Sequence, residues 1–136
     1  MKRVITFGTF DVFHVGHVNI LERARSFGDY LIVGISSDAL NFSKKGRYPI
    51  YSQADRIKIV ESLRFVDAVF VEESLALKGQ YIQEHSADVM VMGDDWAGKF
   101  DEFKPLCDVQ YLTRTPSIST TEIIEVVRTP GASIGR

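Results

Sequence analysis

The stretch GTFDVFHVGH, residues 8–17, decides the fold and the location of the site. It follows an apolar run at residues 4–7, which we expect to be a buried strand. It precedes a segment in which Val18, Leu21 and Ala24 recur at helical spacing. The free N–H groups and positive dipole end of such a helix face the preceding loop. The stretch therefore predicts an anion site at the first strand–helix turn.

The alternation of strand and helix continues along the chain. Four more strands are predicted from apolar runs at residues 30–35, 68–71, 88–92 and 109–112. Helices are expected at 17–27, at 53–65 after Ser52, at 76–85, and at 120–127 after the capping box at 119–122. The polar, basic segment 41–51 is expected to be a loop. This order predicts one doubly wound, Rossmann-like α/β domain over residues 1–136, with a five-stranded parallel sheet and a frayed tail from about residue 129.

The composition narrows the class of protein. Of the 136 residues 45% are hydrophobic and 25% are charged, as in globular proteins. The net charge of -2 argues against nucleic acid as a partner. No apolar run approaches the roughly 20 residues that span a bilayer, so no membrane association is expected. The single cysteine, Cys107, rules out an intrachain disulfide. Together with the lack of a signal-peptide pattern, it favours a cytoplasmic protein.

Two histidines, His14 and His17, flank Gly16 in the first loop, and Thr9 adds a hydroxyl donor. A phosphate chain is the ligand that this set suits best. Two other interpretations stay open, namely a zinc site with an unidentified third ligand and histidines that only satisfy the backbone. A dinucleotide site is disfavoured because the loop does not contain G-x-G-x-x-G.

GTFDVFHVGH resembles the signature of the HxGH cytidylyltransferases, relatives of the class I aminoacyl-tRNA synthetases. The resemblance implies that His14 and His17 contact the triphosphate and stabilise the transition state at the α-phosphorus. It also implies that other residues of the loop lie along the nucleotide: Thr9, Phe10, Val15 and Gly16.

The stretch RTPSISTT, residues 114–121, resembles the RTxGISTT of the glycerol-phosphate branch of the same family. Arginine pairs its donors with phosphate oxygens, and the resemblance makes Arg114 catalytic. It assigns the whole stretch to the nucleotide: Arg114, Thr115, Pro116, Ser117, Ile118, Ser119, Thr120 and Thr121. Pro116-Ser117 replaces the usual residue and glycine, and serine does not adopt every conformation open to glycine.

Three further positions carry the resemblance. GDDWAGKFD, residues 93–101, is similar to GDDWEGKFD of the glycerol-phosphate branch. We expect Asp94 or nearby carbonyl groups to accept from the cytosine amine. Trp96 is expected to pack, and stacking on a ligand is the alternative. The resemblance implies that Lys44 contacts the acceptor and the α-phosphate as a catalytic residue, and that Lys78 binds the acceptor's phosphate. Otherwise Lys44 belongs to a solvated charge run, and Arg56 is expected in a surface ion pair or a dimer contact.

The resemblance implies an enzyme that transfers CMP from CTP to glycerol 3-phosphate, giving CDP-glycerol and pyrophosphate. Mg²⁺ is expected on the CTP phosphates, without a metal site made by the protein. Other acceptors (choline phosphate, ethanolamine phosphate or a sugar phosphate), ATP as donor, and a catalytically silent nucleotide-binding module remain alternatives. The resemblance also implies a homodimer and a product used in teichoic-acid or capsule synthesis.

Overall fold

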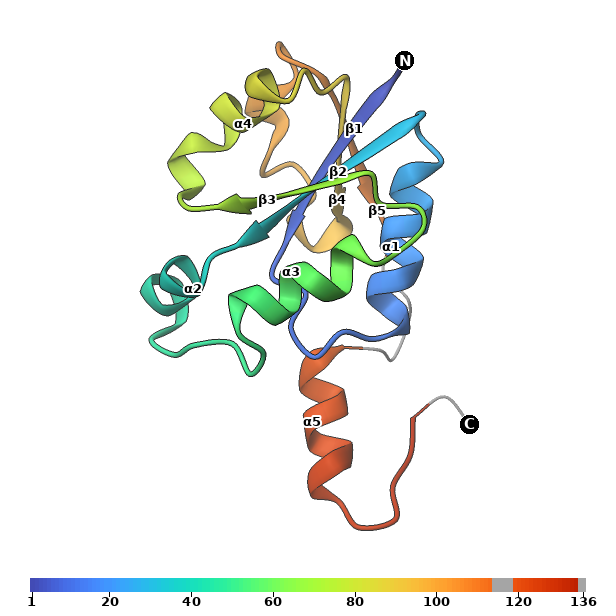
Figure 1. The fold of residues 1–136 in the computed structure, drawn as a ribbon, viewed down its shortest axis with the longest axis vertical. Helices are drawn as coiled ribbons and strands as arrows, with labels where there is room; N and C mark the ends of the chain where they lie inside the picture. Colours follow the sequence, from blue (N-terminus) through green and yellow to red (C-terminus); the bar gives the residue numbers. More distant parts are fainter. Residues whose placement is uncertain (114–118, 135–136) are drawn as a thin grey trace.

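The computed structural model describes residues 1–113 and 119–134, and these residues form an α/β fold around one sheet (Figure 1). The strands are β1 Arg3–Gly8, β2 Tyr30–Ser36, β3 Ala68–Glu72, β4 Val89–Gly93 and β5 Asp108–Leu112. All neighbouring strands are parallel, in the order β3-β2-β1-β4-β5. The predicted α/β class with five parallel strands is confirmed.

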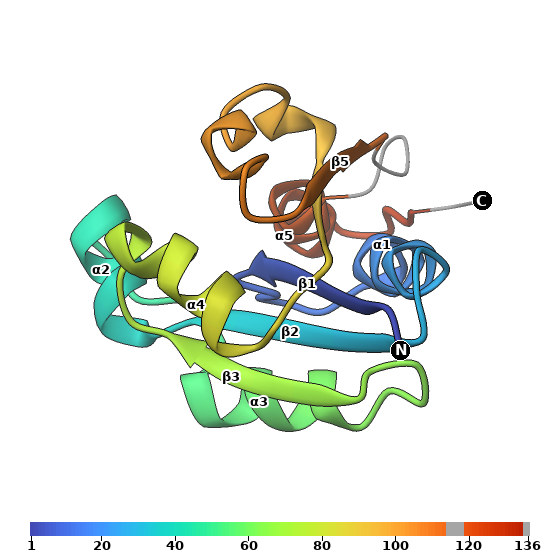
Figure 2. The same cartoon turned by 90° about the horizontal axis from the view of Figure 1, so that it is seen from above.

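Five helices connect and follow the strands: α1 Val15–Arg25, α2 Asp38–Lys45, α3 Gln53–Glu61, α4 Lys78–Glu84 and α5 Thr120–Arg128. Short 3-10 helices lie at η1 Leu75–Leu77, η2 Asp94–Trp96 and η3 Asp101–Phe103. Helices α3 and α4 cover opposite faces of the sheet (Figure 2). Among the described residues, no helix has both the length and the apolar character needed to cross a membrane.

The core has two layers because successive strand residues point to opposite faces. In β1, Val4 belongs to the cluster under α1 and α3, whereas Ile5 belongs to the cluster under α4. Both side chains are fully buried. A parallel sheet covered on both faces explains why its strands read as continuous apolar runs in the sequence.

The strand order places a switch point beside β1. The chain passes from β1 to β2 and β3 on one side, and then crosses to β4 and β5 on the other. In such sheets ligands bind beyond the carboxyl ends of the strands, where the order reverses. The loop at residues 9–14 leaves β1 at this point, and α5 projects from the same end of the sheet (Figure 1).

The prediction of a loop at residues 41–51 is wrong for its first part, because α2 extends over Asp38–Lys45. Ser37 caps this helix by accepting from the Leu40 N–H at 2.9 Å. Gly46 ends it with a left-handed φ of 72°, which glycine adopts without strain. Because Asn41 is the buried residue of α2, the helix lacks an apolar stripe that the sequence could show.

The N-caps predicted for α3 and α5 are confirmed. Ser52 Oγ accepts from the Asp55 N–H at 3.3 Å, and Ser119 Oγ accepts from the Glu122 N–H at 3.1 Å. Helix α3 ends at Glu61, four residues before the expected residue 65.

Candidate active site

The loop between β1 and α1 has an unusual backbone. Phe10 and Val12 adopt positive φ angles of 55° and 44°, which are rare for residues with a Cβ. The Asp11 carboxylate holds this conformation by accepting from the N–H groups of Val12, Ile50 and Tyr51 at 3.0, 2.7 and 2.8 Å. Strain of this kind persists where surrounding contacts enforce it, and it gathers at functional sites.

Gly8 has a structural role in this turn. A Cβ at Gly8 would lie 2.7 Å from the ring of Phe10. The absence of a side chain at Gly8 therefore makes room for Phe10.

Arg56 fixes the loop from beneath. Its side chain is fully buried and donates to the carbonyl oxygens of Thr9 at 2.8 Å and Ser36 at 2.9 Å. It also donates to Tyr51 O at 3.1 Å and pairs with Asp38 at 2.7 Å. Arg56 thus joins the segments that follow β1 and β2 to the start of α3. The expected surface ion pair or dimer contact is wrong, because the side chain lies inside the protein.

The two histidines use one nitrogen each on the backbone. His14 is the N-cap of α1, and its Nδ1 accepts from the Gly16 N–H at 3.0 Å. The His14 N–H in turn donates to His17 Nδ1 at 3.2 Å. The rings stack with centroids 3.8 Å apart. Because Nδ1 of each ring is an acceptor, a neutral imidazole carries its proton on Nε2. The turn therefore presents two Nε2–H donors.

Both imidazoles are neutral at physiological pH. Burial, reinforced by the neighbouring His14, lowers the pKa of His17 to about 3, although Asp11 acts in the opposite direction. Burial also lowers the pKa of His14. The rings of Phe10 and Phe13 lie 5.4 and 5.1 Å from that of His17 and supply part of this burial. The interpretation that the histidines satisfy the backbone holds for Nδ1 and leaves Nε2 for a ligand.

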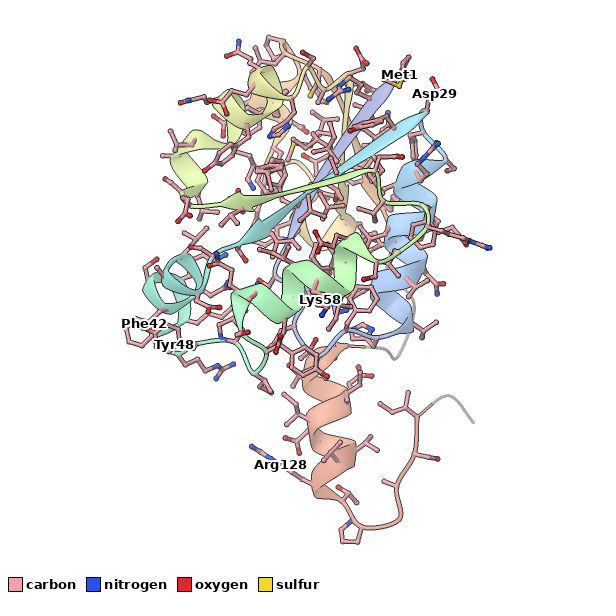
Figure 3. The ribbon with its side chains drawn as sticks, viewed as in Figure 1. Met1, Asp29, Phe42, Tyr48, Lys58 and Arg128 are labelled. Atoms are coloured by element: carbon pink, nitrogen blue, oxygen red, sulfur yellow. The ribbon has the colours of Figure 1, made fainter. Side chains whose placement is uncertain are left out.

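A cleft of about 770 Å³ is lined by His17, whereas His14 is not among the residues that line it. Residues of the first loop, of the segment 45–50, of η2 and of α5 line it, and they include Tyr48 and Arg128, which are labelled in Figure 3. Five of the predicted nucleotide-binding residues line it: Thr9, Phe10, His17, Thr120 and Thr121. The Thr120 hydroxyl also donates to Asp11 O at 2.9 Å, which ties α5 to the first loop. Charged side chains of both signs line the cleft: the cations Lys45, Arg47 and Arg128, and the carboxylates Asp11, Asp95 and Glu125. The cations are the groups that could bind a phosphate chain.

A second cavity of about 390 Å³ adjoins the cleft, and Thr9 and Trp96 line both. The two lysines predicted to bind the acceptor, Lys44 and Lys78, line this second cavity together. Lys78 is buried, and its Nζ lies 2.6 Å from Glu72 Oε2. Burial lowers the pKa of Lys78, and the Glu72 carboxylate opposes that shift. The structure thus places Lys44 and Lys78 in one pocket, next to the histidine loop.

The remaining predicted residues have different positions. His14, Val15 and Gly16 form the start of α1, and Ser119 is the N-cap of α5. Asp94 begins η2, but the residues of η2 that line the cleft are Asp95 and Trp96. Trp96 is 46% exposed, and its ring packs against that of Phe100 with centroids 5.6 Å apart. The predictions for Arg114, Thr115, Pro116, Ser117 and Ile118 lie outside the described residues.

Sequence reasoning missed three residues that shape the site. Asp11 looked like one polar residue of a loop, although a carboxylate next to strained backbone is a usual acceptor of N–H groups. Glu72 ends β3 with a buried side chain. A charged residue directly after an apolar strand is the signal that could have pointed to it. Asn41 is buried and donates from Nδ2 to Ser36 Oγ at 2.8 Å, and no pattern in the sequence marked it.

Comparison with known proteins agrees with this geometry. The sequence profile of the cytidylyltransferase-like family matches residues 5–126, and the chain belongs to that family. Its relatives include the glycerol-3-phosphate cytidylyltransferase of Bacillus subtilis (strain 168), to which it is 50% identical over 127 residues, 93% of this chain and 98% of the relative. The enzyme of the same name from Staphylococcus aureus (strain NCTC 8325 / PS 47) is 47% identical over 123 residues, 90% of this chain and 92% of the relative. The resemblance seen in the sequence is confirmed.

A solved structure shares the fold. The lipopolysaccharide core biosynthesis protein from Thermoplasma volcanium GSS1 superposes with a TM-score of 0.74 at 23% identity, over 85% of this chain and 98% of that one. At this identity the likeness concerns the fold alone.

Proposed function

We propose that this chain transfers the cytidylyl group of CTP to the phosphate of glycerol 3-phosphate, forming CDP-glycerol and releasing pyrophosphate. The observation that carries the proposal is the pair of stacked histidines at the turn between β1 and α1, next to two adjoining cavities of which His17 lines the larger. The relatives that match nearly the full length of the chain, and bear the name of this activity, support the choice of substrates.

The reaction needs positioning more than acid or base catalysis. An oxygen of the acceptor's phosphate is already an anion, and it attacks the α-phosphorus of CTP in line. A new P–O bond forms as the bond to the pyrophosphate oxygen breaks, and no covalent enzyme intermediate is formed. Charge develops on the phosphoryl oxygens in the transition state, where fixed donors have the greatest effect. His14 and His17 supply two such donors through Nε2–H, already oriented by their Nδ1 contacts.

The two cavities suit donor and acceptor. CTP fits the larger cleft, where Lys45, Arg47 and Arg128 face its phosphates. The acceptor fits the smaller cavity with Lys44 and Lys78. The reacting phosphorus then lies where the cavities meet. Two parts of the proposal rest on the resemblance. Asp94 accepts from the cytosine amine, and residues 114–121 help to bind the phosphates.

The described residues fit a Mg²⁺ ion that is held mainly by CTP. Within residues 1–113 and 119–134, no three His, Cys, Asp or Glu side chains gather as a metal site. The Asp11 carboxylate accepts from three backbone N–H groups. Mg²⁺ commonly binds one or two carboxylates together with substrate phosphates and water. When bound, it neutralises charge on the pyrophosphate leaving group.

We further propose that the protein is a cytoplasmic homodimer, because the family resemblance implies a dimer and the cysteine content suits that compartment. Sedimentation equilibrium tests the dimer, which has twice the 15.3 kDa mass of one chain. A single species at the monomer mass at micromolar concentrations contradicts it.

Pyrophosphate release from a panel of substrates tests the proposed activity. CTP, ATP, GTP and UTP are each combined with glycerol 3-phosphate, ethanolamine phosphate, choline phosphate and a sugar phosphate in the presence of Mg²⁺. We expect the highest kcat/KM for CTP with glycerol 3-phosphate. A higher value for another pair assigns the enzyme to that pair. Nucleotide binding without turnover in every combination makes the chain a silent binding module.

A further inference from the structure

In the second cavity, the ammonium group of Lys78 lies among the kinds of partner that proteins use to bind amines. Lys78 Nζ lies 3.8 Å from the centroid of the Phe7 ring and 5.3 Å from that of Phe100. The Glu72 carboxylate pairs with the same nitrogen at 2.6 Å. Aromatic faces combined with a carboxylate are typical of sites that recognise ligand ammonium groups. Here the protein's own lysine occupies them.

The lysine is held firmly in this position. Lys78 and Glu72 are only 4% and 2% exposed. A buried ion pair resists loss of either charge, because the remaining charge would be left without a partner in a poorly solvated place. Lys78 nevertheless lines the cavity, together with its partners Phe7 and Glu72, so its charge acts at short range on a molecule bound there.

We propose that Lys78 makes the second cavity select a phosphorylated polyol over a phosphorylated amino alcohol. Its own ammonium group occupies the place beside the aromatic rings and Glu72 where a ligand ammonium would otherwise bind. This inference rests on the proposed function and concerns the specificity of the same site. Glycerol 3-phosphate brings an anion and neutral hydroxyl groups to Lys78. Ethanolamine phosphate brings a second ammonium group, which the lysine repels and for which the rings and Glu72 are no longer available.

The size of the cavity makes this repulsion hard to avoid. Ethanolamine phosphate carries its nitrogen two carbons from the ester oxygen, and the cavity measures about 390 Å³ with Lys44 as its other amine. A ligand ammonium therefore comes close to one lysine or the other. Glu102 also lines the cavity but is exposed to solvent, where attraction between charges is weak.

The test removes the built-in cation in two ways, together with its carboxylate partner or alone. The double variant Glu72→Gln/Lys78→Met deletes both partners of the buried pair, and Lys78→Met alone keeps the carboxylate for a ligand amine. Lys78→Arg, which keeps the cation, is the conservative variant. Lys58→Met is the matched control, because Lys58 is an exposed cation on α3 that lines neither cavity (Figure 3). Thermal unfolding verifies that each variant is folded.

The decisive quantity is the preference for ethanolamine phosphate over glycerol 3-phosphate, measured both as a ratio of kcat/KM values and as a ratio of binding affinities. Trp96, the single tryptophan, lines the cavity and reports binding through its fluorescence. We expect the preference to rise roughly tenfold or more in the double variant, the scale of one desolvated cation contact. The rise should be larger in Lys78→Met, and absent in Lys78→Arg and Lys58→Met.

An unchanged preference in folded variants overturns the inference. This holds even where both acceptors lose affinity equally, because the loss of a phosphate contact that both acceptors share produces the same result. Turnover with CTP tests the proposed function, whereas the ratio of the two acceptor affinities tests Lys78. The two ideas therefore fail separately.

Discussion

The two nitrogens of each site histidine have separate tasks, and substitutions can remove one task at a time. In His14→Asn and His17→Asn, the amide oxygen lies near the position of Nδ1 and keeps the acceptor of the backbone N–H, but nothing replaces Nε2. In the glutamine variants the longer amide reaches toward Nε2 and the acceptor at Nδ1 is lost. Stability and catalysis should therefore respond in opposite ways to the two substitutions.

The expected magnitudes follow from the contacts. Nδ1 of His14 caps the Gly16 N–H at 3.0 Å, and asparagine is a favoured N-cap. His14→Asn should change the free energy of unfolding by less than about 1 kcal/mol, whereas losing a cap in His14→Gln costs about 1 kcal/mol. Each asparagine variant loses one transition-state donor, so kcat should fall by roughly 10²- to 10³-fold. The glutamine variants should retain more activity than the asparagine variants.

Urea unfolding gives the stabilities, and pyrophosphate release at saturating CTP and glycerol 3-phosphate gives kcat. Glu22→Ala is a control at an exposed position of α1 that lines neither cavity. Near wild-type kcat in both asparagine variants would refute the idea that the histidines donate through Nε2. Higher activity in the asparagine variants than in the glutamine variants would refute the division of tasks.

Three further outcomes follow from the structure. Arg56→Met should lower the free energy of unfolding by about 3 kcal/mol, because it leaves the buried partners of the guanidinium without their cation. Arg64→Met, at an exposed position, is the control. Equal urea midpoints for Arg56→Met and the wild type would contradict this role. Between pH 6.5 and 4, His17 binds a proton in the unfolded chain but stays neutral in the folded chain, where its pKa is about 3. The free energy of unfolding should thus fall by up to about 1.4 kcal/mol per pH unit as the pH decreases, and a slope that His17→Asn does not reduce would count against it. Chelation by EDTA should stop turnover without shifting the thermal midpoint, since the expected Mg²⁺ belongs to the nucleotide; a lower midpoint would indicate a structural metal.

The sheet could be predicted because its strands are buried on both faces and read as apolar runs. The first loop could be predicted because two histidines and a glycine stand at a strand–helix turn. Helix α2 was missed because its stability comes from its caps, Ser37 and Gly46, rather than from an apolar stripe.

Tertiary contacts account for what the sequence does not reveal about the site. Arg56 looks like a surface residue of an amphipathic helix, and only the convergence of three chain segments makes it a buried anchor. Glu72 ends β3 and Lys78 begins α4. The segment between them, which contains η1, folds so that the two side chains meet at the second cavity. Such partners depend on topology, which local patterns do not encode.

The protonation of the site histidines tests the central claim most directly. The chain contains three histidines, so long-range ¹H–¹⁵N correlation spectra of ¹⁵N-labelled protein can follow each ring through a pH titration, with the Asn variants giving the assignments. We expect His14 and His17 to be neutral with the proton on Nε2 at pH 7, and His17 to remain neutral far below pH 6.5. A proton on Nδ1 of either ring, or titration of His17 near pH 6.5, would contradict the account of two neutral Nε2–H donors.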